Sequence, residues 1–217
     1  MTVLQPLTWA EERVLEGLHA LGLGWGLAIV GLTLLVRLAL VPVVVRQLRA
    51  QRELAAHLPE LRRLQAEHRD DRERQQHELR AYYEEHGVNP LAPFVPLLVQ
   101  IPVVVSLYYV MRADARSGLF GDTGFLFIPH LGARPHGLVL LALVVAYVAA
   151  QAASSLIATR KLQAGQRGLL LGVPLLFAAI VPRVPAGLAV YWVTTALWSL
   201  GQQLVMARVA PAPGPDR

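Results

Sequence analysis

A single arginine, Arg37, places a positive charge inside an apolar stretch that runs from Gly22 to Val45. As an α-helix rising ~1.5 Å per residue, these roughly 24 residues would span the ~30 Å hydrocarbon core of a bilayer. Arg37 precedes Arg46, the next charge, by about eight residues, which would hold its guanidinium ~12 Å inside the apolar layer. Burying an arginine there costs ~2.5–3.5 kcal/mol on insertion scales, so the group must meet water, polar side chains or an anionic guest. The chemistry it offers is attraction of acidic groups.

Polar side chains of other apolar stretches fall at a matching depth. Counted from the cytosolic end of their own stretches, Gln100, Gln151 and Gln202 lie about five to eight residues in, which places them ~8–14 Å below the membrane surface. The predicted set adds neighbours at helical spacing and comprises Arg37, Thr33, Gln100, Gln151, Ser155, Thr194, Thr195, Trp198 and Gln202. We interpret it as the lining of a hydrophilic groove, open to the cytosol and sealed towards the outside. The alternative is that each glutamine merely holds two helices together.

The sequence lacks the motifs of energy-using and hydrolytic enzymes. It contains no Walker A, GxGxxG, GxSxG or HExxH pattern, and it has no cysteine for zinc binding or disulfides. All histidines and all carboxylates lie outside the apolar stretches, whereas proton-coupled transporters and intramembrane proteases need such groups inside the bundle. Arg37 therefore has no acidic partner within any stretch. We expect no enzymatic activity, no metal and no cofactor.

The elements that must position these side chains are five apolar stretches. With 54% hydrophobic residues among 217, the composition indicates an all-α membrane protein with five transmembrane helices. The stretches are Gly22–Val45, about Pro93–Met111, about Gly137–Thr159, Gly168–Val181 and Ala186–Ala207. The fourth is short and contains a proline, so it needs a thinned bilayer or sheltering neighbours to cross. Residues 1–21 are mildly amphipathic and predict an N-terminal helix lying along the membrane interface.

Arginine and lysine residues orient this bundle. They gather in the loop between the first two stretches, between the third and fourth, and after the fifth: Arg46, Arg49, Arg52, Arg62, Arg63, Arg69, Arg72, Arg74, Arg80, Arg160, Lys161, Arg167 and Arg208. By the positive-inside rule the N-terminus is outside and the C-terminus is cytosolic. We expect the membrane to be a bacterial plasma membrane. The same rule, together with affinity for anionic lipid, accounts for the net charge of +5 without a direct role in nucleic-acid binding.

Residues 22–208 are predicted to form one core that includes a cytosolic helical hairpin at 46–87 and an outer loop at 112–136. The hairpin should turn near His68–Asp71, with Asp70 and Glu73 as the capping box of its second helix. A solvated charged connector is the alternative for this loop. In the outer loop the apolar quartet at 125–128 is expected to enter the headgroup region, and residues 209–217 are expected to form a disordered tail.

Four strings carry a family resemblance. They are LLVRLALVPVVVRQLRAQRELAAHLPELRRLQ, HGVNPLAPFVPLLVQIPVVVSLYYVM, GFLFIPHLG and VPAGLAVYWVTTALWSLGQQ. The match to which they belong extends over nearly the whole chain, from about Pro6 to Arg208. In these strings the chain resembles the YidC family of membrane protein insertases, which includes the mitochondrial Oxa and chloroplast Alb proteins. The family's intramembrane arginine falls on Arg37, whereas Ala196 stands where the family often has asparagine. The resemblance is to the minimal five-span form.

The resemblance implies an insertase or chaperone that moves newly made membrane proteins into the bilayer without nucleotide hydrolysis. Its implied partners are nascent membrane proteins and lipid, with the ribosome, a targeting factor and the Sec translocon as further candidates. Two other functions use the same residues differently. A small-solute transporter or channel would pass its substrate through the groove, and a purely structural assembly partner would bind membrane proteins without inserting them.

Overall fold

The computed structural model describes residues 4–89, 95–117, 120, 123–158 and 177–209. Every regular element in those ranges is a helix, apart from an isolated β-bridge between Phe125 and Ile128. The prediction of an all-α fold is confirmed for these ranges. The chain divides into two compact units, one of Met1–Leu38 with Val103–Arg217 and the other of Ala39–Pro102.

Helix α1 (Gln5–Ala20) occupies most of the segment predicted as an interfacial helix. Its inner face is closely packed, since Leu15 and Glu11 are only 2% and 3% exposed. On its outer face Trp9 is 60% exposed, and the guanidinium of Arg13 lies over the Trp9 ring. The amphipathic pattern read from the sequence therefore corresponds to one buried and one exposed face.

Helix α2 (Trp25–Glu67) continues far beyond the first predicted apolar stretch and runs through Pro42 and Pro59 without ending. Each proline removes a backbone hydrogen bond and crowds the preceding turn, which a long helix tolerates as a kink. By length and apolar composition, two segments of the described chain could cross a membrane: Trp25–Gln47 in α2 and Gly137–Ser154 in α5.

The other predicted spans are described in part. Helix α4 (Val95–Ser117) contains a shorter apolar segment, Leu98–Ala113, and helix α7 (Ala186–Val209) covers the fifth predicted stretch. Two predicted regions lie outside the described residues: 168–176, most of the fourth stretch, and 210–217, most of the predicted tail. The count of five spans therefore stays a prediction.

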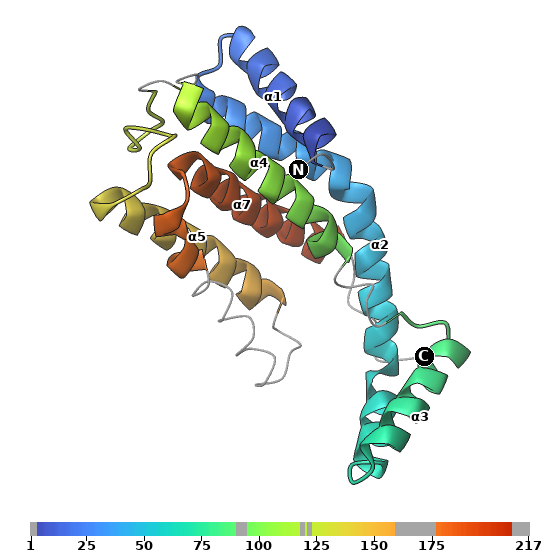
Figure 1. The fold of residues 1–217 in the computed structure, drawn as a ribbon. Helices are drawn as coiled ribbons and strands as arrows, with labels where there is room; N and C mark the ends of the chain where they lie inside the picture. The colour runs from blue at the N-terminus through green and yellow to red at the C-terminus, as the bar shows by residue number, and fades with distance from the viewer. Residues whose placement is uncertain (1–3, 90–94, 118–119, 121–122, 159–176, 210–217) are drawn as a thin grey trace. The chain divides into compact units, whose positions relative to one another are not determined.

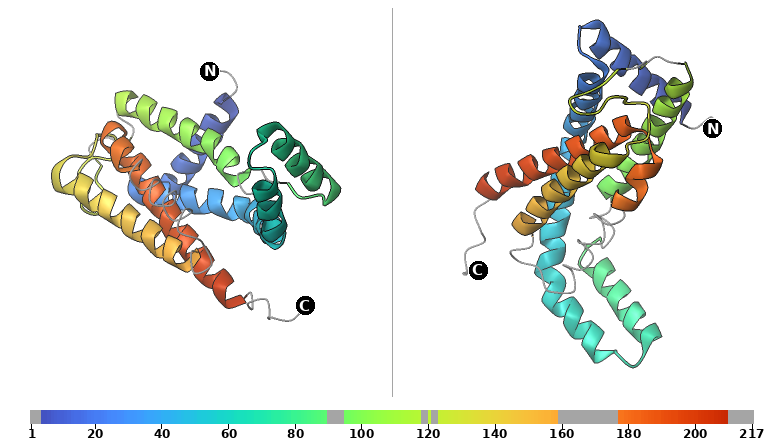
Figure 2. Two further views of the ribbon diagram at one scale, coloured as in Figure 1. Left: turned by 90° about the horizontal axis from the view of Figure 1, so that it is seen from below. Right: turned by 90° about the vertical axis from the view of Figure 1, so that its left-hand side faces the viewer.

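Helices α5 (Gly137–Ala158) and α7 pack side by side in the first unit, as both figures show (Figure 1; Figure 2). Their N-terminal ends lie close together because the loop before α5 is bonded to the start of α7. Ala186 donates its backbone N–H to the Ala133 carbonyl, and Gly187 donates to the Leu131 carbonyl, both at 2.8 Å. A short 3₁₀ helix, η3 (Val181–Arg183), precedes this junction.

Aromatic rings fill the space between α5 and α7. The ring of Phe177 stacks on Tyr147 of α5 with centroids 3.6 Å apart, and it meets Trp192 of α7 edge-on at 5.2 Å. These rings join a continuous apolar core that also contains residues of α1, α2 and α4. The core gives α5 and α7 fixed neighbours, which is what a site built on their side chains requires.

In the second unit, the distal part of α2 and helix α3 (Arg72–Glu85) form a helical hairpin (Figure 1). The turn falls at His68–Asp71 as predicted, but the prediction of Asp70 as the helix cap is wrong. Asp71 is the N-cap, and its carboxylate accepts the backbone N–H of Arg74 at 3.0 Å. The capping side chain must come from the residue directly before the first helical turn, and adjacent aspartates leave a one-residue ambiguity in the sequence.

Helix α3 ends in a Schellman motif. Gly87 adopts a φ of 64°, a left-handed conformation that glycine enters without steric cost. The backbone N–H of Gly87 then reaches the Glu84 carbonyl, and that of Val88 reaches the Tyr83 carbonyl at 3.0 Å. The helix therefore ends at the glycine that the sequence marks.

Candidate functional site

Arg37 lies on α2 in the first unit, with its side chain half-buried. Among the described residues its Nε atom is buried without a hydrogen-bond partner. The side chain of Tyr191, on α7 and 1% exposed, is within electrostatic range of the guanidinium. Within the described ranges the ion pairs are Arg13–Glu16, Arg63–Glu60 and Arg80–Glu84, all on exposed helix faces. None of these described ion pairs includes Arg37.

Thr33 precedes Arg37 by one helical turn. It is 0% exposed, and its hydroxyl donates to the backbone carbonyl of Ile29 at 2.7 Å. This bond within the helix satisfies the hydroxyl donor, as threonine often does in membrane helices. Thr33 thus supplies a buried polar position beside Arg37 while its hydrogen is held by its own helix.

Helix α7 presents the largest group of predicted site residues. Thr194 donates its hydroxyl to the Val190 carbonyl at 2.8 Å, and the Trp198 indole N–H donates to the Gln202 amide oxygen at 3.2 Å. Thr195 differs from Thr194, because its Oγ1 is buried with no hydrogen-bond partner in the described part of the chain. All four side chains are half-buried, so they are neither core residues nor fully open to the surroundings.

Helix α5 contributes Gln151 and Ser154. Gln151 is half-buried, and Ser154 is 4% exposed with its Oγ lacking a partner among the described residues. Ser155 follows within α5, but its side chain lies outside what the structure describes. Gln100 is half-buried on α4 and belongs to the second unit, so the structure does not bring it into one set with the residues above.

Buried polar atoms without partners concentrate in the first unit. Within the described residues they are Glu11 Oε2, Arg37 Nε, Ser154 Oγ, Thr195 Oγ1 and Gln203 Oε1. Each unsatisfied polar atom in a dry interior costs about 1–3 kcal/mol, and water is the usual remedy where the space is polar. Four of these five atoms lie on α2, α5 and α7, the helices that carry the predicted site. Each of these three helices thus carries at least one buried polar atom that its described neighbours leave unsatisfied.

Three residues of this polar group are absent from the predicted set, namely Ser154, Tyr191 and Gln203. Tyr191 could have been found, since it precedes Thr194, Thr195 and Trp198 by three, four and seven residues and so shares their helix face. Gln203 follows Gln202 directly and points to a different face, which sequence spacing does not connect with the others.

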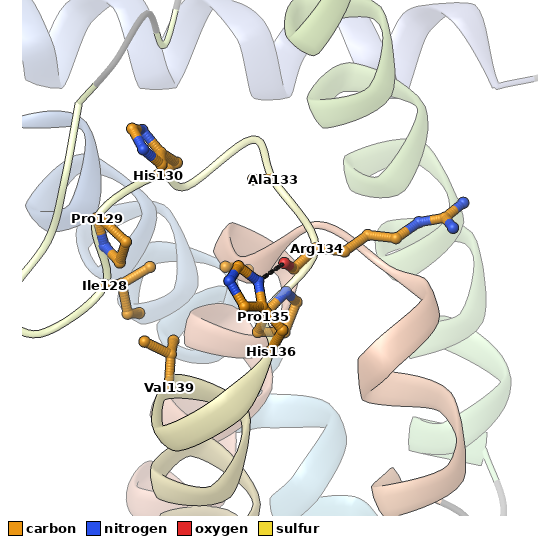
Figure 3. Close-up of a pocket in the computed structure, with 9 residues that line it drawn as sticks. Ile128, Pro129, His130, Ala133, Arg134, Pro135, His136 and Val139 are labelled. Atoms are coloured by element: carbon orange, nitrogen blue, oxygen red, sulfur yellow. Dashed lines mark hydrogen bonds between the residues drawn. The ribbon is translucent and has the colours of Figure 1, made fainter.

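No group of three or more metal-ligating side chains occurs within the described residues. Two hollows in the described part of the chain lie elsewhere. One of about 350 Å³ lies between α1 and α4, and one of about 60 Å³ lies beneath the loop before α5 (Figure 3). Neither is lined by a predicted site residue.

The model of the family described as 60Kd inner membrane protein matches residues 17–212. The chain belongs to this family. It is the YidC/Oxa/Alb family, so the resemblance read from the four strings is confirmed. A solved relative, described as an active YidC insertase with its first transmembrane domain resolved, superposes with a TM-score of 0.66 at 25% identity. The superposed region covers 93% of this chain and 45% of the solved relative.

Curated members of the family differ in length from this chain. The membrane protein insertase YidC of Streptomyces avermitilis is 29% identical, over 89% of this chain and 53% of that protein. The inner membrane ALBINO3-like protein 2 of Chlamydomonas reinhardtii is 34% identical, over 88% and 52%. The YidC of Tropheryma whipplei is 28% identical, over 98% and 86%. The chain thus spans about half the length of the first two relatives and most of the third.

Proposed function

We propose that this protein is a membrane protein insertase and chaperone that works without nucleotide hydrolysis and without catalytic chemistry. Segments of newly made membrane proteins would enter a hydrophilic groove open to the cytosol. The groove would be lined by Arg37, Thr33, Gln100, Gln151, Ser155, Thr194, Thr195, Trp198 and Gln202. Membership of a family whose curated relatives are named insertases supports this activity.

The observation that carries the proposal is the environment of Arg37. Its buried Nε atom has no hydrogen-bond partner among the described residues, and unpartnered polar atoms of α5 and α7 belong to the same unit. An acidic group ~4 Å from the guanidinium would gain about 4 kcal/mol at an effective dielectric constant near 20, before desolvation is counted. A polar segment held there crosses a shorter apolar path, and its apolar part then enters lipid, with ~25 cal/mol gained per Å² buried.

The proposal includes a topology and a set of partners. The N-terminus would lie outside and the C-terminus in the cytosol of a bacterial plasma membrane, following the arginine distribution. The hairpin at 46–87 would receive nascent membrane proteins, or the ribosome, targeting factor or Sec translocon that delivers them. Residues 1–21 would lie along the interface, and 22–208 would form the insertase core with its outer loop at 112–136.

Exchange of Arg37 tests the proposal. In cells depleted of their own insertase, Arg37→Ala should lower insertion of a substrate with an acidic translocated tail by about tenfold or more. That factor corresponds to losing a charged interaction of ~1.5–3 kcal/mol. Arg37→Lys should retain most of the activity because it keeps the charge. Arg13→Ala, which removes an exposed charge from α1, outside both the proposed groove and the hairpin, serves as the control and should insert normally.

A substrate whose acidic tail has been neutralised should depend much less on Arg37. Full insertion of the acidic substrate by the alanine variant would refute the groove mechanism. Reconstitution into liposomes separates the proposal from solute transport, because an insertase integrates a short membrane protein without nucleotide whereas a transporter moves solute with saturable kinetics.

A further inference from the structure

A tight turn in the loop before α5 presents two apolar side chains to the surroundings. Phe125 and Ile128 exchange backbone hydrogen bonds of 2.8 and 2.9 Å, which closes the turn and leaves Leu126 and Phe127 at its tip. Leu126 is 83% exposed and Phe127 is 53% exposed. Ile128, by contrast, is 3% exposed. The apolar quartet expected from the sequence to enter the headgroup region is therefore divided into a buried base and an exposed tip.

The base of this turn is held in a fixed place. The ring of Phe125 lies so close to Gly26 of α2 that a Cβ at position 26 would overlap it. Gly124 is similarly enclosed, since a Cβ there would meet the Ile128 carbonyl oxygen. Glycine at both positions permits the close approach, and the turn is consequently fixed to the N-terminal end of α2.

The tip adopts a backbone conformation that its residue type disfavours. Leu126 has a φ of 54°, the only positive φ of a non-glycine residue in the described part of the chain. A left-handed conformation is uncommon for residues other than glycine, asparagine and aspartate, and it often marks a functional constraint. Asparagine or glycine would suit both the turn and an aqueous surrounding better. A leucine here is accounted for if its surrounding is apolar.

The position of the turn indicates what that surrounding is. Gly26 is the second residue of the apolar segment Trp25–Gln47, and the membrane-length segment of α5 begins at Gly137, shortly after the turn. The same loop is bonded to the first two residues of α7 through Ala133 and Leu131. The turn therefore lies at the level where α2, α5 and α7 begin. A bilayer crossed by these helices would have its boundary between headgroups and acyl chains at that level.

Polar side chains follow the tip along the same loop. His130, Arg134 and His136 are exposed, and Figure 3 shows the side chain of Arg134 extending away from the two histidines. His136 Nδ1 lies 3.4 Å from the carbonyl oxygen of Arg134, and this contact orients the His136 ring. A loop with an apolar tip and basic or polar neighbours has the composition of interfacial anchors.

We propose that Leu126 and Phe127 insert into the acyl region of the leaflet at which α2, α5 and α7 begin, so that phospholipid is the partner of this surface. The chain has no cysteine, which allows single labels at chosen sites. The protein would be prepared as Leu126→Cys, Phe127→Cys and, as the control, Ala133→Cys, an exposed position on the same loop. Each variant would carry a nitroxide spin label in vesicles of phosphatidylethanolamine and phosphatidylglycerol.

Collision of the nitroxide with dissolved oxygen and with a water-soluble nickel chelate reports depth. Labels at 126 and 127 should show an oxygen-to-nickel accessibility ratio severalfold above that at 133. Equal ratios at the three positions would overturn the proposal, since the tip would then be in water. Protection of 126 and 127 from both reagents would also overturn it, because it would show that protein covers the tip, such as a second copy of the chain.

A second measurement covers the case in which a spin label disturbs the turn. A membrane-impermeant maleimide, supplied on both sides of the vesicle membrane, should modify unlabelled Ala133→Cys rapidly and the two tip variants severalfold more slowly. All three should react alike after denaturation. Equal rates in intact vesicles would contradict lipid insertion independently of the nitroxide data.

Discussion

Glu11 is a carboxylic acid held almost out of contact with water, on the face of α1 that packs into the first unit. The Ser106 hydroxyl of α4 donates to its Oε1 at 2.8 Å, while Oε2 is buried without a partner among the described residues. Burial raises the pKa of Glu11 to about 8. The hydrogen bond from Ser106 lowers this pKa by a smaller amount, and the negative charge of Glu12 raises it slightly. The acid is thus mostly protonated at neutral pH and joins α1 to α4 as a neutral group.

This pKa predicts how stability depends on pH. The carboxyl has an ordinary pKa of 4.5 and a pKa of about 8 in the folded protein, so the folded state binds the extra proton between these values. Its contribution to folding stability should therefore fall as the pH rises from about 4.5 to about 8 and then level off. Thermal unfolding of the purified protein across this range should show the decline. Glu11→Gln should flatten it, whereas Glu16→Gln, at an exposed position, should leave it intact.

Two threonines allow a direct test of hydration at the proposed site. The hydroxyl of Thr33 is bonded to the Ile29 carbonyl, whereas Thr195 Oγ1 is buried and unpartnered within the described residues. If a water molecule forms a hydrogen bond with Thr195 Oγ1, Thr195→Val should reduce insertion of an acidic-tailed substrate. The expected reduction is a factor of about 2–5, which corresponds to the loss of one hydrogen bond. Thr33→Val makes the same exchange at a hydroxyl satisfied within its own helix and should change insertion less. A larger loss for Thr33→Val would contradict a wet site at Thr195.

At the scale of elements, the arms of the hairpin are joined by rings rather than by a large apolar core. The Tyr82 hydroxyl lies 2.8 Å from His57 Nδ1 across the hairpin, and the Tyr82 ring stacks on His86 with centroids 4.0 Å apart. The rings of His57 and His86 also meet, at 5.2 Å. We call the contact among His57, Tyr82 and His86 the aromatic clasp; it joins the two arms near the end of the hairpin opposite the turn.

Tyr82→Phe should weaken the clasp by about 1 kcal/mol, since it removes a single partly buried hydrogen bond and keeps the ring stacking. Amide hydrogen exchange in the full-length protein should then be faster in α3 and unchanged in α5. Tyr83→Phe is the matched control at the neighbouring half-buried tyrosine. Equal protection of α3 in both variants would show that the Tyr82–His57 bond contributes nothing to the stability of the hairpin.

The sequence predicted elements better than it predicted side-chain partners. Apolar length located the helices, and Gly87 and the paired aspartates located the ends of α3, because these signals act over a few neighbouring residues. Depth counting selected Arg37 and the α7 residues, but it could not tell that Thr33 is satisfied by its own backbone and Thr195 is not. That difference depends on rotamers and packing, which residue spacing does not contain. For the same reason the apolar quartet could not be divided into base and tip.

At the scale of the whole molecule, the division into two units separates the proposed tasks. The first unit contains Arg37 with α5 and α7, and the second contains the hairpin, whose contacts described above are internal to it. A unit held together by its own contacts can be removed with limited cost to the other. The proposed function assigns reception of substrate to the hairpin and passage into lipid to the groove residues, most of which belong to the first unit. It needs both tasks.

Deletion of Glu53–Glu84, with a short glycine linker across the gap, tests this division. The His57 and His86 rings show that the two arms lie close together near the ends of the deleted segment, so a short linker suffices. The first unit should keep its unfolding temperature and its Glu11-dependent pH profile, because Glu11 and Ser106 both belong to it. Insertion in depleted cells should nevertheless be lost. Normal insertion would show that the hairpin is dispensable, and a lowered unfolding temperature would show that the two units depend on each other for stability.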